Sequence, residues 1–272
     1  MLFELILIRQ AIVLVGCGAA AYTDAKTGLI LDKITYSMIA AGILLNIFQG
    51  EWAWLAVGAA VFAIGYIIYY MGKVGGGDVK LFTGIAFLLP FYQGQFFLLN
   101  ALFAACILAV LFYSAYYLLK YARKGIDLKE NKHGIGKAVL FGIVIGIWLV
   151  IVSITQVVSV TALLTLGIVL GLALLFLAFE KGIRRQFFLK EIPISKLEED
   201  EVIATEFLKH GIRKKLGLKF KGVFGEEEKA KLKNLGVAKV PVYRNMPPFG
   251  PFILLGCIAA MLWPDIIGLI FA

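Results

Sequence analysis

Apolar residues occur along the chain in long blocks, and the breaks between blocks are marked by charged residues, glycine or proline. The blocks lack the period-two alternation of apolar and polar residues that the strands of a membrane β-barrel require. A helix needs roughly 20 apolar residues to cross the hydrocarbon core. We therefore predict an all-α polytopic membrane protein, a bundle of about eight transmembrane helices over residues 3–23, 34–49, 52–71, 79–92, 95–119, 138–155, 160–179 and 249–271.

The fourth block is the shortest, because its apolar run extends only from Val79 to Leu89. We predict a short or tilted helix there, buried among its neighbours. Composition agrees with a lipid environment, since 61% of the 272 residues are hydrophobic and only 17% are charged. A soluble globular domain has a far higher charged fraction.

Basic residues predict the orientation, because Lys and Arg in short loops are retained on the cytoplasmic side. Of the 27 basic residues, all but Arg9 fall in four segments: 24–33, 72–80, 120–137 and 180–248. The loops that alternate with these segments contain no Lys or Arg. We expect a multi-pass protein of the cell membrane with both termini outside and the basic segments in the cytoplasm. Arg9 is expected to snorkel toward the outer headgroups.

This pattern divides the chain into three parts. Residues 1–180 form a membrane domain, 181–248 are too polar to cross a bilayer and form a small cytoplasmic domain of α/β type, and 249–272 form the final transmembrane helix. Within the polar part, residues 226–235 predict a short helix capped by Gly236, and 238–243 predict a strand or an extended entry to the last span.

Several classes of protein are disfavoured. The net charge of +9 follows from topology and attraction to anionic lipid, so the bilayer is the expected partner and nucleic acid is not. Cys17, Cys106 and Cys257 stand alone in apolar blocks and are interpreted as small core residues. His133 and His210 fall in cytoplasmic segments, and there is no HExxH motif. We therefore expect no metal or cofactor, and neither a zinc nor a serine-histidine protease.

Two aspartates differ from the other boundary charges. Asp24 ends the first block after a run of small residues, and Asp78 opens the fourth block directly after Gly75, Gly76 and Gly77. The predicted topology places both on the cytoplasmic side at about the same depth. Residues far apart in sequence are thus expected to meet as a carboxylate pair.

Such a pair suits peptide hydrolysis, because two carboxyl groups about 3 Å apart in a poorly hydrated site share one proton. One aspartate then takes a proton from water while the other protonates the scissile carbonyl. The three glycines remove side chains and allow positive φ, which would let a substrate backbone approach Asp78. The positive end of the helix that begins there favours one negative charge on the pair.

Gly75-Gly76-Gly77-Asp78 fits the GxGD signature of membrane aspartic proteases, and the longer GGGDVK segment resembles the type IV prepilin peptidase family. The chain is most similar to the archaeal preflagellin and prepilin peptidases, whose pattern is matched by Asp24, Lys26 and Asp32. It lacks the paired CxxC motifs and the Pro-Asn of many bacterial members. The resemblance covers roughly the first hundred residues and, more loosely, a proline-rich segment at 247–252.

The resemblance implies an aspartic endopeptidase with Asp24 and Asp78 as catalytic residues. Its substrates would be pilin-like or archaellin-like precursors of a type IV pilus or archaellum, which lose a short basic leader on the cytoplasmic side. Lys80 could contact the substrate or a lipid phosphate, or it could simply anchor the topology.

Three alternatives remain open. A polytopic cation transporter could use Asp24 and Asp78 as ion ligands, with the glycines as a helix break. An enzyme like presenilin or signal peptide peptidase would keep the chemistry and cut within transmembrane helices, although its Pro-Ala-Leu motif is missing. A scaffold of the pilus machinery would have no activity.

Overall fold

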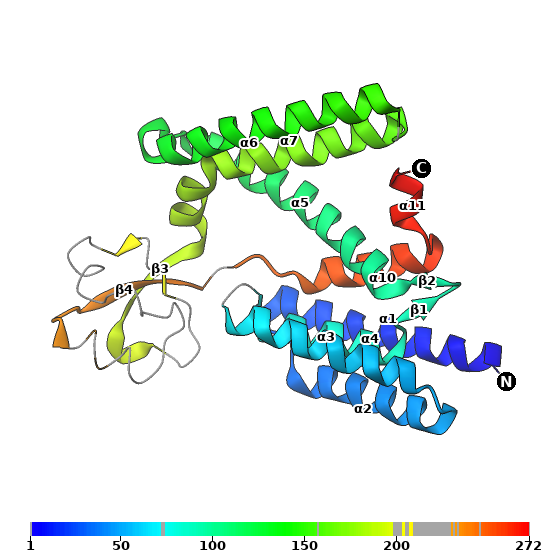
Figure 1. Ribbon diagram of the computed structural model, residues 1–272. Coiled ribbons are helices and arrows are strands. Elements are labelled where there is room, and N and C mark those ends of the chain that lie inside the picture. Colours follow the sequence, from blue (N-terminus) through cyan, green and yellow to red (C-terminus); the bar gives the residue numbers. More distant parts are fainter. Residues whose placement is uncertain are drawn as a thin grey trace. The chain divides into compact units, whose positions relative to one another are not determined.

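The computed structural model describes residues 2–71, 74–156, 158–197, 203–204, 207–208, 230, 232, 234–244 and 246–271. The chain divides into two compact units (Figure 1). The first comprises Met1–Glu180 with Pro247–Ala272, and the second comprises Lys181–Met246.

Each predicted apolar block contains helix (Figure 1). The helices of the first unit are α1 (Leu2–Thr27), α2 (Asp32–Gln49), α3 (Trp52–Tyr70), α4 (Gly76–Leu88), α5 (Phe97–Lys124), α6 (Leu128–Thr155), α7 (Val160–Ile183), α10 (Gly250–Leu262) and α11 (Ile266–Phe271). Five of the described helices, α1, α3, α5, α6 and α7, are long and apolar enough to cross a membrane. The prediction of an all-α polytopic membrane protein is confirmed, whereas eight crossings stay a prediction.

The short helix α4 lies against α2 and α3, and most of its residues are buried, as the sequence predicts. Close approach depends on glycines: Gly42 of α2 and Gly58 of α3 pack so tightly on Phe87 that neither has room for a Cβ atom. The helix ends at Leu88, four residues before the predicted end of the span. Pro90 follows two residues later, which disfavours helical geometry at Leu89.

Arg9 does not reach the outer headgroups, and that prediction is wrong. Its side chain is 2% exposed. Its guanidinium donates to the carbonyl of Leu88 at 2.7 Å and to Asn46 Oδ1 at 2.8 Å, and lies 4.6 Å from the centroid of the Trp54 ring. Asn46 in turn donates to the carbonyl of Phe87 at 2.9 Å. The last carbonyls of a buried helix need donors, and a cation suits the negative end of the helix dipole.

The last apolar block is not one helix as predicted. α10 ends at Leu262 and α11 begins at Ile266. Pro264 explains the break, since proline disfavours helical geometry at Trp263, whose φ and ψ are −130° and 87°. Asp265 Oδ1 then accepts the Gly268 N–H at 2.9 Å and starts the short α11. Whether this region crosses the bilayer stays a prediction.

Two neighbouring connections also differ from the predicted boundaries. A hairpin of β1 (Phe91–Tyr92) and β2 (Gln95–Phe96) joins α4 to α5. Its turn residues, Gln93 and Gly94, both have positive φ, as a tight hairpin turn requires. α6 begins ten residues before the predicted 138, because Asp127 caps it by accepting the N–H groups of Lys129 and Glu130.

α1 and α10 pack against each other through small residues. Asp24 contacts Gly250 at one end, and the buried Cys17 and Cys257 side chains face each other further along. Residue numbers rise along one helix as they fall along the other, so the two helices run antiparallel. The interpretation of the cysteines as core residues holds for these two, but Cys106 is exposed on α5.

The second unit contains an antiparallel pair of strands, β3 (Leu189–Pro193) and β4 (Lys239–Tyr243), preceded by a π-helical turn over Arg184–Phe188. β4 confirms the strand predicted at 238–243. A short 3-10 helix, Ile194–Lys196, follows β3. The helix predicted at 226–235 lies mostly outside the described residues, and so does His210. The cytoplasmic location of this unit stays a prediction.

Topology can be tested with single cysteines in a cysteine-free variant. Lys129 and Gln93 are both exposed and stand at opposite ends of the predicted crossings. We expect a cysteine at Lys129 to be protected from an impermeant thiol reagent in intact cells, and one at Gln93 to react. Both should react after the membrane is permeabilised. Labelling of Lys129Cys in sealed cells would reverse the predicted orientation.

Candidate active site

Asp24 lies in the last turn of α1 and is 7% exposed. Its Oδ2 accepts the backbone N–H of Gly250, the first residue of α10, at 2.7 Å. A Cβ atom at Gly250 would lie 3.0 Å from this oxygen and 3.3 Å from Ala21 Cα. Glycine at 250 and alanine at 21 therefore allow the two helices to approach until the carboxylate is buried against backbone.

Asp78 lies in the first turn of α4, one residue before the predicted span. Gly75 is the N-cap of this helix, and its backbone N–H favours the ionised form of the Asp78 carboxyl group, which stands at the helical position of the acidic residue in a capping box. Burial and the nearby Asp24 charge nevertheless raise the pKa of Asp78 to about 6, against the lowering effect of the Gly75 bond. The protonated form is thus favoured well above the ordinary carboxyl range.

The fold places Asp24 and Asp78 close enough for the charge of one to act on the other. α1 supplies the first from its carboxyl end and α4 supplies the second from its amino end, and these helices contact each other. Two such carboxyl groups hold one proton between them over part of the pH range. Chemically, the pair can both accept a proton from water and donate one to a carbonyl.

The glycines before Asp78 act differently from the expectation. Gly75 has φ −68° and ψ 142°, and neither Gly76 nor Gly77 has positive φ, so left-handed backbone is not the reason for them. They lack side chains because the start of α4 is crowded. A Cβ at Gly77 would lie 2.9 Å from Ile30 Cβ, and one at Gly75 would lie 3.0 Å from Asp78 Oδ2.

A valine at Gly77 should therefore displace the first turn of α4 and with it Asp78. We expect Gly77→Val to reduce precursor cleavage by at least about tenfold, the cost of roughly 1.4 kcal/mol in the transition state. Gly18→Val is the matched control, because a Cβ at Gly18 in α1 meets nothing within 4 Å. Cleavage by membranes with equal amounts of each variant measures both. Equal activities of the two variants would contradict the packing argument.

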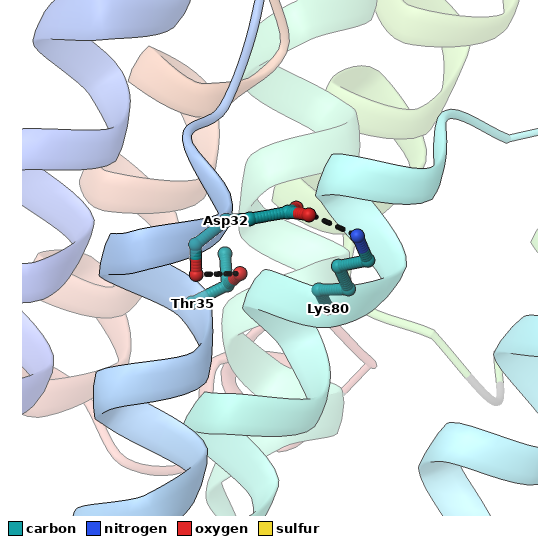
Figure 2. A network of polar contacts seen from close by, with 3 residues as sticks. All are labelled: Asp32, Thr35 and Lys80. Atoms are coloured by element: carbon teal, nitrogen blue, oxygen red, sulfur yellow. Dashed lines mark hydrogen bonds and ion pairs between the residues drawn. The ribbon is translucent and has the colours of Figure 1, made fainter.

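Lys80 forms an ion pair with Asp32 (Figure 2). Lys80 Nζ donates to Asp32 Oδ1 at 2.6 Å and lies 5.1 Å from the centroid of the Tyr36 ring. The carbonyl of Asp32 accepts the Thr35 hydroxyl at 3.2 Å. The pair joins the first turn of α2 to α4 at Lys80, two residues after Asp78. Sequence reasoning singled out both residues and did not pair them.

Two further residues near Asp24 were missed. Gly250 provides the N–H bond, and Tyr113 of α5 donates its hydroxyl to the carbonyl of Pro248 at 2.6 Å, just before α10. The proline-rich segment was noticed only for its resemblance. Among the described residues, no group of three or more His, Cys, Asp or Glu side chains could hold a metal ion.

The segment that carries both aspartates is similar to a known protein family. Residues 11–113 match the type IV leader peptidase family. The resemblance predicted from the GGGD segment is confirmed over this part of the chain, which includes Asp24, Asp78 and Lys80 but not Gly250.

A similar curated protein is prepilin peptidase EppA of Methanothermobacter thermautotrophicus, which is 39% identical over 93 residues. The match covers 31% of this chain and 24% of the relative, so the chain spans about a quarter of the length of the relative that it matches. No solved structure matches the chain.

Proposed function

We propose that this protein is a membrane aspartic endopeptidase that removes short basic leader peptides from pilin-like or archaellin-like precursors at the cytoplasmic face. The observation that carries the proposal is that the buried Asp24 of α1 and the half-buried Asp78 of α4 lie close enough for their charges to interact, inside the segment that matches the leader peptidase family. Asp24 and Asp78 are the catalytic residues, and no metal or cofactor takes part.

In the proposed reaction the ionised aspartate takes a proton from a water molecule, whose oxygen attacks the scissile carbonyl carbon. The protonated aspartate gives its proton to the carbonyl oxygen, and a tetrahedral diol forms. The roles then reverse: one aspartate protonates the leaving amine while the other removes a proton from the diol. The C–N bond breaks and the dyad returns with one proton.

The substrate class is supported by the name of the relative, a prepilin peptidase, and by the position of Asp24 and Asp78 at helix ends beside predicted cytoplasmic loops. A precursor with a basic leader in the cytoplasm and an apolar helix in the bilayer would present its junction at this depth. Basic residues of the loops agree with the predicted face.

The direct test is cleavage of a pilin-like or archaellin-like precursor by purified protein in detergent or lipid vesicles. We expect a shortened product whose new amino terminus begins just before the apolar helix. If the protein were instead a cation transporter, ion flux into sealed vesicles would be seen without peptide hydrolysis. The scaffold predicts neither, and an enzyme like presenilin predicts cuts inside the apolar helix.

The pH dependence follows from the proton on Asp78. Because its pKa is raised to about 6 by burial and by Asp24, the acid form is lost as the pH rises through this range. We expect kcat/KM to be bell-shaped, with an alkaline limb near pH 6, well above the titration of an ordinary aspartate. Rates across pH 3 to 9 would measure it. Full activity at pH 9 would contradict the requirement for a proton on Asp78.

A further inference from the structure

The first turn of α10 directs one amide at Asp24. In an α-helix the first amides have no partner within the helix. Here Pro251 has no N–H, and the amides of Phe252 and Ile253 bond to the carbonyl of Phe249 at 3.0 and 3.1 Å. The Gly250 N–H instead donates to Asp24 Oδ2 at 2.7 Å. The positive end of a 13-residue helix therefore lies against this carboxylate.

This contact is held from several sides. The Tyr113 hydroxyl bonds the carbonyl of Pro248 at 2.6 Å, and its ring lies 5.0 Å from the ring of Phe252 in an edge-on arrangement. α5 thus fixes the chain on both sides of Gly250. The absence of a side chain at 250 also helps, since any Cβ would lie 3.0 Å from Asp24 Oδ2, closer than an ordinary contact.

Other titratable groups around Asp24 come from α1 itself and from α2, α4, α5 and α10. Asp78 of α4 and Tyr113 of α5 both interact with the Asp24 charge. Lys80 of α4 forms an ion pair with Asp32 of α2, and the ammonium group of Lys26 on α1 lies over the ring of Tyr22. Cys257, the titratable residue of α10, faces Cys17 instead.

We propose that the amino-terminal turn of α10, through the Gly250 N–H, holds the negative charge of the resting dyad on Asp24. Asp24 is then the base that activates water, and Asp78 is the acid that protonates the scissile carbonyl. This assignment rests on the proposed function. Gly250 and Tyr113 are positioning residues, because they act on the reaction through Asp24. The last apolar block is therefore part of the active site as well as a predicted membrane segment.

The asymmetry at Asp78 agrees with this assignment. Asp78 also receives a backbone N–H, from Gly75, yet burial and the Asp24 charge outweigh that bond and raise the pKa of Asp78. When two carboxyl groups share one proton, the negative charge lies mainly on the group whose hydrogen-bond donors stabilise the ionised form better. The Gly250 amide, backed by the α10 dipole, gives Asp24 that advantage.

A matched pair of variants at Gly250 separates the amide from the space around it. Gly250→Ala and Gly250→Pro both add a Cβ atom, but only proline removes the N–H. Proline also disfavours the helical backbone of Phe249, so the amounts of the two variants in membranes are compared first. We expect the acidic limb of kcat/KM to move up by about one pH unit in Gly250→Pro, because Asp24 loses a donor to its ionised form. Gly250→Ala should keep the parental limb at a lower rate. The same acidic limb in both variants would overturn the proposal.

If Gly250→Pro does not accumulate in membranes, Tyr113→Phe provides the second measurement. It keeps the ring against Phe252 and removes the hydroxyl that anchors Pro248. The acidic limb should shift in the same direction by a smaller amount, whereas Tyr116→Phe, which alters an exposed hydroxyl on the same helix, should leave it unchanged. An unshifted limb in Tyr113→Phe would then overturn the proposal.

Labelling of the unsubstituted protein tests the charge directly and needs no precursor. An ionised carboxylate oxygen attacks a carbon of a small aryl epoxide, the new C–O bond forms as the ring C–O bond breaks, and the alkoxide takes a proton from the neighbouring carboxyl group. Peptide mapping at pH 5 should find the ester on Asp24 at least tenfold more than on Asp78. An ester mainly on Asp78, or none on Asp24, would overturn the assignment. Failure to cleave any precursor while Asp24 is labelled would instead count against the proposed function alone.

Discussion

Asp24→Asn and Asp78→Asn should each abolish leader removal from a co-expressed precursor. An amide can neither take a proton from water nor return one to the carbonyl, so each change removes one partner of the shared-proton pair. We expect losses of at least about a thousandfold, with the double variant no worse than either single one, because the two carboxyl groups act as a unit. Immunoblots of precursor and product at matched enzyme levels measure this effect.

Asp32→Asn and Asp265→Asn are the control variants. Asp32 is paired with Lys80, and Asp265 caps α11, so both have structural contacts but no assigned acid or base role. Both variants should retain measurable cleavage. If Asp78→Asn, purified away from the host's own peptidase, trimmed the precursor within a few-fold of the parent, the aspartic protease proposal would have to be abandoned.

Asp78→Asn should also be more stable than the parent at neutral pH. Because the pKa of Asp78 is raised on folding, ionisation of its carboxyl group destabilises the folded state; stability is lost as pH rises from its unfolded pKa through about 6. Removing the charge abolishes this cost at pH 8 and changes little at pH 4 and below. A higher unfolding temperature together with lost activity would exclude misfolding as the cause of inactivity.

Arg9→Met should have the second largest effect, this time on stability. The guanidinium supplies donors to the carbonyl of Leu88 and to Asn46, and methionine leaves both buried acceptors without them. An unsatisfied buried group costs about 1–3 kcal/mol, so we expect the two acceptors together to lower the unfolding free energy by about 2–6 kcal/mol. Thermal unfolding in detergent measures the change.

Arg9→Lys should lie between Arg9→Met and the parent, because an ammonium group lacks the planar fork that reaches both acceptors. Lys33→Met is the control, since it removes an exposed cation from α2. Loss of Arg9 should also lower cleavage, because α4 is anchored by Arg9 at one end and carries Asp78 at the other. If Arg9→Met unfolded at the same temperature as Lys33→Met, the buried network would contribute no net stability.

Much of the fold could be predicted because lipid imposes a simple rule. Every backbone polar group in hydrocarbon must be satisfied within its own segment, so a long apolar block predicts a helix, and each predicted block contains one. Single residues also predicted structure where they act on the backbone of their immediate neighbours. Residues 238–243 were predicted as a strand and form β4, whereas the helix break at Pro264 was a local signal that the length of the apolar block obscured.

The sequence nominated two residues for the candidate site but not the contacts that hold them. Asp24 and Asp78 were singled out because carboxyl groups are rare at a membrane boundary, and the same argument brought them to one side. Arg9 was misplaced for the opposite reason. A lone cation in an apolar block could snorkel or be buried, and only the packed end of α4 supplies the carbonyls that favour burial.

By itself, the sequence determined the helices, their alternation with basic loops and the two aspartates, because hydrophobic periodicity, charge bias and motif spacing are properties of neighbouring residues. Only the tertiary structure decided that Lys80 pairs with Asp32, that Arg9 caps α4 and that Gly250 donates to Asp24. Each of these contacts joins segments whose approach depends on how glycine-lined helices pack. The distances between these side chains and backbone groups depend on how all the helices pack together, so they cannot be predicted from the residue pattern of one segment.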